Sequence, residues 1–374
     1  MTATTRLGES VRAPRLYVAF ELGRQEWLVA LTSGFGVAPW LCRVAAGDWR
    51  GVDQAVARGR DRLGLPGDAG VVSCYEAGRD GFWIHRALGA RGIANRVVDS
   101  SSIEVNRRAR RAKTDRLDAR KLVAMLVRVC AGERGVWCEV HVPSEAVEAA
   151  RHVSRERTAL TQEATHLTNQ MRGWLTTWGA TLPRRAGAWW TTVRDWEGRP
   201  LPAVLQARLM RTAARLAVVD AQLAELEAQQ AAAVAAAPVT SAARALVQLK
   251  GIATTSASVL LDEGLVWRAF QNRRQIGGLL GFAPTPHQSG DLARGGSISG
   301  AGNARLQAIS IQLAWNWIRW QPTSALTQWY HARFGTGKRL RRIGIVAVAR
   351  KLVIALWRYV THGVLPTGAV LKAA

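Results

Sequence analysis

Four acidic residues stand in sequence contexts that suit phosphoryl chemistry. Glu21 is near the end of the apolar run LYVAFEL, and Glu76 is near the end of the run GVVSCYEA. A carboxylate at the end of a buried strand is costly when unpaired, so it is exposed at the sheet edge, paired, or bound to a cation. We expect cation binding at Glu21 and Glu76.

A second pair of acids stands at the start of a predicted helix. Asp115 and Asp118 are three residues apart, which places both side chains on one helix face. With Glu21 and Glu76 they would form an oxygen-rich site for one or two magnesium ions, the ion type that holds phosphate during phosphoryl transfer. The same spacing is also typical of a helix capping box, and this alternative stays open.

Cations surround the second pair of acids. They would attract a nucleic-acid strand to a site that the acids alone would repel, so they favour the metal site over the cap. The cluster immediately before the helix consists of Arg107, Arg108, Arg110, Arg111 and Lys113.

The charge of the whole chain points to a polyanionic partner. The 374 residues include 51 Lys and Arg against 27 Asp and Glu, a net charge of +24. Residues 292–374 hold 12 basic and no acidic residues. We predict nucleic-acid contacts in this tail. Its densest cationic run comes at the start of a helix predicted over 343–360 and consists of Lys338, Arg339, Arg341 and Arg342.

Several classes of protein are excluded by composition. No stretch of 18 or more apolar residues is free of charge, and the first residues lack an apolar signal segment. Cys42, Cys74, Cys130 and Cys138 show neither zinc-site nor disulfide-framework spacing. We therefore expect a soluble cytoplasmic protein with no membrane segment.

The order of predicted elements indicates three parts. Residues 14–140 carry three meander strands and then strands alternating with helices, the order of an RNase H-like α/β domain. Residues 141–240 hold long helices predicted over 144–178 and 201–236, which indicate a helical hairpin or coiled-coil arm for packing and oligomerisation. Residues 241–374 are predicted to form a mainly α domain.

Residues 245–264 of that last part resemble a helix-hairpin-helix. Its tight turn, with Lys250 and Gly251, would offer backbone N–H groups to a phosphate. A buried helical hairpin fits these residues equally well. The tail tryptophans lie in apolar helical pattern and are predicted to be core and interface anchors; they are Trp315, Trp317, Trp320 and Trp329.

Sequence blocks in both halves resemble a known family. VAFELG (18–23), YEAGRDGFWIHRAL (75–88) and RRAKTDRLDARKL (110–122) resemble the blocks of the DEDD-type transposases of the insertion-sequence 110/1111 group, whose N-terminal domain is RuvC-like. GFAPTPHQSGD (281–291) and RGGSISGAGNARL (294–306) resemble that group's C-terminal transposase domain.

The resemblance implies a function. Glu21, Glu76, Asp115 and Asp118 correspond to the family's acids, and Ser289 to its catalytic serine, which forms a phosphoserine link to DNA with magnesium. It also implies a homo-oligomer that binds element and target DNA and a non-coding bridge RNA, associated with the bacterial nucleoid.

The family's basic positions are matched only in part. Arg305 is an expected phosphate contact, whereas Gly300, Ala304 and Gln307 stand where we expect basic residues. Arg294 and the cationic run at 338–342 would compensate as phosphate contacts, or this copy is impaired. Two alternatives to the recombinase stay open: a RuvC-like nuclease that uses water, and a catalytically impaired nucleic-acid-binding descendant.

From the residues alone, Ser289 is one loop serine among many. The adjacent Gly290 permits close approach of a phosphodiester, and a base or metal would have to activate the hydroxyl. His287 is near enough in sequence to be that base, although a metal site would already serve this purpose.

Overall fold

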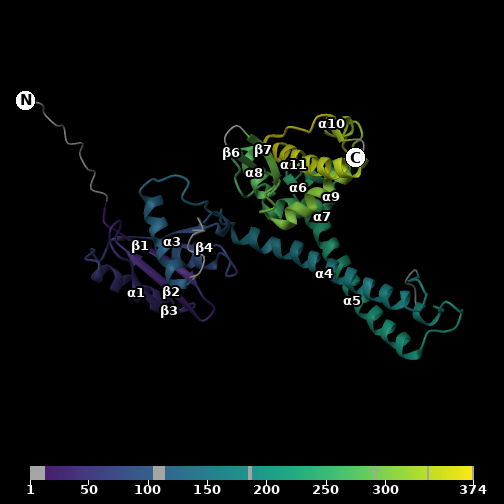
Figure 1. Cartoon of the computed structure of the whole chain (residues 1–374), viewed down its shortest axis with the longest axis horizontal. Helices are drawn as coiled ribbons and strands as arrows, with labels where there is room; N and C mark the ends of the chain where they lie inside the picture. Colours follow the sequence, from purple (N-terminus) through teal and green to yellow (C-terminus); the bar gives the residue numbers. More distant parts are fainter. Residues whose placement is uncertain (1–12, 104–113, 184–187, 290–291, 335–336, 373–374) are drawn as a thin grey trace, which may run out of the picture. The chain divides into compact units, whose positions relative to one another are not determined.

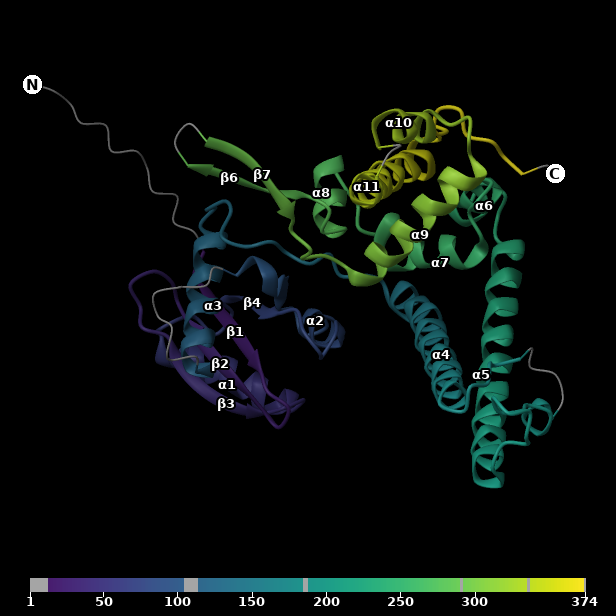
Figure 2. The same ribbon diagram turned by 45° about the vertical axis from the view of Figure 1, so that its right-hand side comes forward.

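The computed structural model describes residues 13–103, 114–183, 188–289, 292–334 and 337–372. The chain divides into two compact units, with the boundary between Val142 and Pro143. Figure 1 and Figure 2 label the elements of each unit.

A five-stranded sheet forms the centre of the N-terminal unit, which confirms the prediction of an α/β unit. The strand order is β3-β2-β1-β4-β5. β1 pairs antiparallel with β2 and β2 with β3, whereas β1, β4 and β5 are parallel. The strands are β1 (Arg15–Leu22), β2 (Glu26–Thr32), β3 (Trp40–Ala45), β4 (Gly70–Glu76) and β5 (Ala94–Val98).

Helices cover both faces of this sheet because its strands are apolar on both sides. Phe20 of β1 packs in one cluster with residues of α1 (Trp49–Arg62) and α2 (Trp83–Gly89). Ala19, the neighbour of Phe20, points to the opposite face and packs with residues of α3 (Asp115–Cys130). A short 3₁₀ turn, η1 (Ser100–Ser102), follows β5.

Two long helices open the C-terminal unit and form an arm. α4 (Glu145–Thr176) and α5 (Ala203–Ala236) lie close to the predicted ranges, and the turn η2 (Trp189–Thr191) lies in their connection. The helices run antiparallel, because Arg157 of α4 pairs with Glu227 of α5 while Trp174 lies under Arg208. Buried leucines from both helices, including Leu167 and Leu209, pack between them.

The rest of the C-terminal unit is a helical body, as predicted. Its core includes Leu260, Leu313 and Leu352, from three different helices. In the described ranges, no helix is long and apolar enough to cross a membrane. The elements are α6 (Ala242–Gln248), α7 (Thr254–Leu260), the π-helical turn η3 (Leu261–Leu265), α8 (Arg273–Leu279), α9 (Ala304–Trp320), α10 (Ala325–Phe334) and α11 (Lys338–His362).

A β-ribbon lies between α8 and α9 and was not predicted from the sequence. β6 (Pro284–Ser289) pairs antiparallel with β7 (Leu292–Ile298). Pro284 and Pro286 argue against a strand, because proline donates no backbone hydrogen bond. In a two-stranded ribbon, however, every strand is an edge and can leave such positions unpaired. The register shifts between these two prolines.

Candidate functional site

Glu21 and Glu76 lie side by side at the same edge of the sheet. In the parallel pairing of β1 with β4, Phe20 is opposite Tyr75, and the two glutamates are the next residue on each strand. Ala19 and Cys74, two residues earlier, pack against α3. Because strand side chains alternate, both glutamates belong to the face that α3 covers. Glu21 is half-buried and Glu76 is exposed.

Asp115 and Asp118 begin α3 on its sheet-facing side. Ala119 and Leu122 are buried against the sheet, and each aspartate precedes one of them by four residues, one helical turn. The Cys74 thiol donates to the Leu122 carbonyl oxygen across 3.9 Å, which places this part of α3 beside the middle of β4.

The direction of α3 brings its first turn toward the two glutamates. Burial raises the pKa of the Cys130 thiol at the end of α3, while the charges of Arg96 and of Arg15 oppose the rise. Arg15 begins β1, so α3 ends where β1 starts and runs antiparallel to it. The aspartates therefore lie at the carboxyl ends of the parallel strands, the edge that carries Glu21 and Glu76.

Three of these acids have no cationic partner in the structure as described. Other acids of the N-terminal unit are paired, such as Asp53 with Arg91 and Glu133 with Arg128. No ion pair between described residues involves Glu76, Asp115 or Asp118. Within the described residues, these three carboxylates are therefore not neutralised by a Lys or Arg side chain.

The acids share an edge without forming a closed metal cage. Among the described residues, no three His, Cys, Asp or Glu side chains approach closely enough to hold a metal ion. The donor set nevertheless fits magnesium, because all its ligand atoms are carboxylate oxygens. Magnesium is usually bound through one or two carboxylates, with waters and substrate phosphates completing the shell.

The capping-box interpretation of Asp115 and Asp118 is wrong. The helix begins at Asp115, its N-cap is Thr114, and the Thr114 side chain makes no capping hydrogen bond. A capping box needs an acid or amide at the third helical position, where this helix has Leu117. Asp115 and Asp118 therefore do not form a capping box.

Ser289 lies at the end of a strand instead of in a loop, which corrects the expectation from sequence. It is the last residue of β6 and pairs with Leu292, so it is next to the tip of the ribbon. His287 pairs with Arg294 in the same ribbon. The structure describes Ser289, His287 and Arg294 through their backbone, and Gly290 lies outside the described residues.

The base of the ribbon is tied to the end of α8. The Gly300 N–H donates to the Gly281 carbonyl oxygen across 3.1 Å, and the Asn303 N–H donates to Leu279 across 2.8 Å. A side chain at Gly281 would collide with the Gln307 amide, since an added Cβ would lie 2.5 Å from Nε2. The residues at the base of the ribbon are therefore tightly packed.

A buried carboxylate, which sequence reasoning missed, anchors this region. Glu263 in η3 is 1 % exposed and lies 3.3 Å from both Arg151 and Arg155 of α4. Asn303 donates to the same carboxylate across 2.8 Å and also caps α9. Burial alone would raise the pKa of Glu263, but the Asn303 hydrogen bond and the two arginines lower it.

Glu263 thus joins the start of the arm to the helix that follows the ribbon. Asp262, its neighbour, has its pKa raised to about 6 by burial, against a hydrogen bond from Ser154. The signal in the sequence was a pair of acids ending an apolar helix, with two arginines four residues apart on another helix.

The structure describes only some of the residues predicted to contact nucleic acid. Arg107, Arg108, Arg110, Arg111 and Lys113 lie outside the described residues. In α11, Arg339, Arg341 and Arg342 are exposed, and Lys338 is described through its backbone. Arg305 in α9 is half-buried, with its Nη1 atom enclosed.

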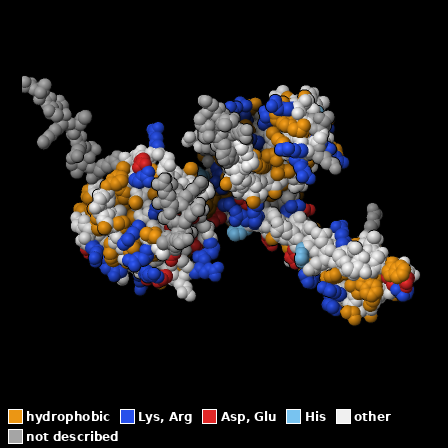
Figure 3. Space-filling model, viewed as in Figure 1, with side chains coloured by type: hydrophobic (Ala, Val, Ile, Leu, Met, Phe, Trp, Pro, Cys, Tyr) orange, Lys and Arg blue, Asp and Glu red, His pale blue; other side chains and the backbone are white. Residues whose placement is uncertain are grey.

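The tail keeps its cations unpaired within the described ranges. None of the ion pairs there involves a residue after 292. Figure 3 shows Lys and Arg side chains interspersed with apolar ones over the region of α10 and α11. Unneutralised charge of one sign over a folded surface is the electrostatic footprint of a polyanion-binding protein.

The turn at Lys250 and Gly251 is packed into the body. Gly251 has a φ of 86°. The Lys250 N–H donates to the Val370 carbonyl oxygen across 3.1 Å, and Gln321 donates to the Lys250 carbonyl oxygen across 2.9 Å. The backbone of Lys250 is therefore engaged within the protein, and its exposed side chain is the part that faces solvent.

Comparisons with known proteins identify the family of the chain. Residues 243–329 match the model of the transposase IS116/IS110/IS902 family. The chain is 41% identical, over 96% of its length and 94% of the relative's, to a protein of Sinorhizobium fredii provisionally named transposase y4rJ. It is 30% identical, over 66% of its length and 72% of the relative's, to a Pseudomonas aeruginosa protein provisionally named a family 20 transposase. The chain therefore belongs to the IS116/IS110/IS902 family of transposases.

Proposed function

We propose that the protein is a DNA recombinase that uses Ser289 as its nucleophile and magnesium at the acid edge of the N-terminal unit. The observation that carries the proposal is the placement of Glu21, Glu76, Asp115 and Asp118 on one face at one sheet edge. The strand order β3-β2-β1-β4-β5, with an antiparallel meander and two added parallel strands, supports an RNase H or RuvC-like fold.

In the proposed reaction, the Ser289 hydroxyl attacks a DNA phosphorus atom. An Oγ–P bond forms, one P–O bond of the strand breaks, and the leaving strand oxygen takes a proton. The hydroxyl proton passes to a carboxylate of the acid set. Magnesium, when bound there, supplies charge stabilisation at the phosphate. Arg339, Arg341 and Arg342 of α11 hold the strand by its phosphate backbone.

The two halves of this machinery belong to different units. The acids lie in the N-terminal unit and Ser289 in the C-terminal unit. The proposal therefore requires them to meet, within one subunit or between subunits of a homo-oligomer. The antiparallel α4 and α5 arm supports a coiled-coil role in assembly, because Val204, Val218 and Met210 are exposed on α5.

We further propose that a bridge RNA guides the protein to its DNA targets in the bacterial cytoplasm. The excess charge supports this assignment, because base pairing would read sequence while protein cations hold backbones. The helix, turn and helix around Gly251 support a helix-hairpin-helix-like element that uses the Lys250 side chain.

A covalent-adduct assay tests the proposal. The full chain, element-end DNA, co-purified RNA and magnesium are mixed, and protein-linked DNA is separated in SDS. We expect an adduct with the native chain and with Thr285→Ala, a control in β6, but none with Ser289→Ala. DNA cleavage without an adduct would indicate that the protein is a nuclease that uses water. DNA binding without cleavage would indicate a catalytically impaired descendant.

A further inference from the structure

A pocket on the helical body lies outside the machinery described above. Its volume is about 330 Å³, near the lower end of the range for small-ligand sites. It opens between α10, α11 and the segment that follows α11. Its aromatic and cationic lining comes from Trp329, Lys351 and Arg358.

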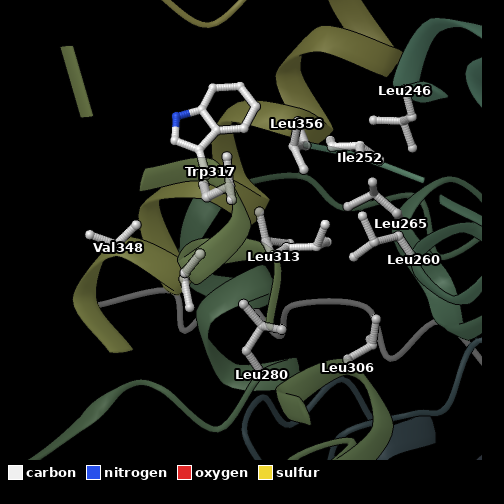
Figure 4. Packing of buried hydrophobic residues seen from close by; sticks show 14 of the residues in the cluster. Leu246, Ile252, Leu260, Leu265, Leu280, Leu306, Leu313, Trp317, Val348 and Leu356 are labelled. Carbon is white, nitrogen blue, oxygen red and sulfur yellow. The ribbon is translucent and has the colours of Figure 1, made fainter. Parts of the chain in front are cut away.

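Hydrogen bonds hold the floor and one wall of the pocket in place. Trp317 is 1 % exposed, and its indole N–H donates to the Ser324 hydroxyl across 2.9 Å. Figure 4 shows Trp317 beside the apolar side chains of the core. The segment after α11 is held by the Ala325 N–H, which donates to the Thr367 carbonyl oxygen across 3.1 Å.

Gly368 fixes the same wall. It has a φ of 71°, and an added Cβ would lie 2.7 Å from the Thr323 carbonyl oxygen. Only glycine fits both the conformation and the close approach. The wall is therefore a defined surface, held against the start of α10.

The lining combines one aromatic ring with two cations. Trp329 is half-buried, and the Lys351 ammonium lies over its ring, 4.5 Å from the ring centroid, in a cation–π contact. Lys351 and Arg358 are exposed and seven residues apart, which puts them on one face of α11. No acidic residue lines this pocket, and residues 292–374 contain none.

An aromatic ring flanked by unpaired cations suits one class of ligand. A base released from pairing stacks on an aromatic ring, and the phosphates beside it pair with Lys or Arg. A base inside a duplex presents only its edges and cannot stack in this way. We propose that this pocket binds an unpaired nucleotide of a single strand. Lys351 moves from the Trp329 ring to a phosphate, the base stacks on the ring in its place, and Arg358 binds the neighbouring phosphate.

The inference deepens the proposed function and rests on it for the source of the strand. Single-stranded RNA and single-stranded DNA share this chemistry, so both are probes. Binding needs no strand cleavage, and the measurements use the full chain carrying Ser289→Ala. A failure of the serine chemistry would appear only in the adduct assay, and a failure of the pocket only in the binding assay.

The experiment measures fluorescence anisotropy of labelled oligo(U) and oligo(dT) at several salt concentrations. Two variants change the pocket, Trp329→Leu and Lys351→Gln. Two matched controls remove an exposed tryptophan and an exposed cation of α9 outside the pocket, Trp315→Leu and Arg319→Gln. Circular dichroism establishes that each variant is folded.

We expect Trp329→Leu to weaken binding of a single strand by about tenfold at each salt concentration, because one stacked base is lost. Lys351→Gln lowers the slope of log affinity against log salt by about 0.7, the value for one phosphate contact on a single strand. Duplex DNA binding does not change. If the pocket variants bind oligo(U) more weakly but bind oligo(dT) normally, the strand comes from the guide RNA. If only oligo(dT) binding is weakened, the strand is DNA.

Photocrosslinking gives a second measurement. Strands that contain 5-iodouracil are crosslinked to the Ser289→Ala chain, whose pocket residues are unchanged. We expect the crosslinked peptide to contain Trp329. Equal effects of pocket and control variants, or crosslinks only elsewhere, would overturn the inference. So would competition by oligoglutamate as effective as that by oligo(dT), because the pocket would then respond to charge alone.

Discussion

The side-chain amide of Gln307 donates a hydrogen bond to the carbonyl oxygen of Gly300 across 3.3 Å. These are two positions where the family pattern led us to expect basic residues. Gly300 has a φ of 65°, a conformation that glycine adopts without strain. The departures therefore form one local arrangement at the base of the ribbon, next to the strand that ends in Ser289.

Restoring a basic residue at Gly300 is expected to destabilise the chain. Gly300→Arg should lower the free energy of unfolding by about 1 kcal/mol, because a side chain disfavours the left-handed conformation. Steric collision adds nothing, since an added Cβ has no neighbour within 4 Å. Gly300→Asn should cost less, because Asn tolerates this conformation. Denaturant unfolding measures both, and a gain in stability with Gly300→Arg would refute this explanation.

Removal of the Glu263 charge is expected to be far more damaging than removal of an exposed one. Glu263→Gln leaves Arg151, 12% exposed, without its charged partner, and breaking a buried pair costs about 3–5 kcal/mol. Glu227→Gln is the matched control, because Glu227 is 51% exposed in its pair with Arg157, and such pairs contribute about 1 kcal/mol or less. Denaturant midpoints measure both. Equal losses would mean that Glu263 is not an anchor.

Asp262 is expected to make stability fall as pH rises. Its pKa of about 6, raised by burial and by the charge of Glu263, means that the folded chain holds this proton more tightly than the unfolded chain. Its favourable contribution is complete below the unfolded pKa, near 4, and is lost as pH rises through about 6.

The variant Asp262→Asn isolates this effect. The native chain should lose more stability than Asp262→Asn between about pH 5 and about pH 7.5. The lowered pKa of Glu263 acts in a different window, because its contribution is lost only as pH falls below the ordinary glutamate value. Parallel pH profiles of the two chains would show that Asp262 does not titrate in this range.

The acid set is expected to be essential for strand exchange. Asp115→Asn or Asp118→Asn should abolish it, because each removes a negative oxygen ligand for magnesium while keeping the helix start. Chelation of magnesium should have the same effect on the native chain. Glu133→Gln, which changes an acid already paired with Arg128, is the control. Normal exchange by both aspartate variants would exclude them from the site.

A shorter side chain at the first acid gives a graded test. Glu21→Asp removes one methylene and draws the carboxylate oxygens back by about 1 Å or more, which alters metal geometry. Strand exchange should fall and should need more magnesium to recover. A magnesium titration measures the change, and an unaltered half-saturation point would indicate that Glu21 does not contact the ion.

Strong periodic patterns made much of the fold predictable. The strand around Glu21, the long arm helices and the helix that begins at Asp115 follow from apolar runs and helical spacing. The ribbon ending in Ser289 could not be predicted, because Pro286 and the neighbouring glycines give no strand pattern. Its base is held by the hydrogen bond from Gly300 to Gly281, a contact that local sequence pattern does not indicate.

The candidate site was predictable where acids stood out against apolar strands. Glu76 could be recognised in that way, and its proximity to Glu21 followed only from the register of β1 and β4. Glu263 was missed because its partners, Arg151 and Asn303, are far away in the sequence. The local sequence pattern therefore identifies an unusual charged residue, but only the tertiary structure shows which residues contact it.

Identification of the amino acid that becomes linked to DNA decides whether Ser289 is the nucleophile. The adduct is digested with nuclease and protease, and the modified peptide is sequenced by mass spectrometry. We expect a nucleotide phosphate on the Ser289 hydroxyl, at the end of β6. A phosphate on any other residue, or cleaved DNA with no linked peptide, would contradict it.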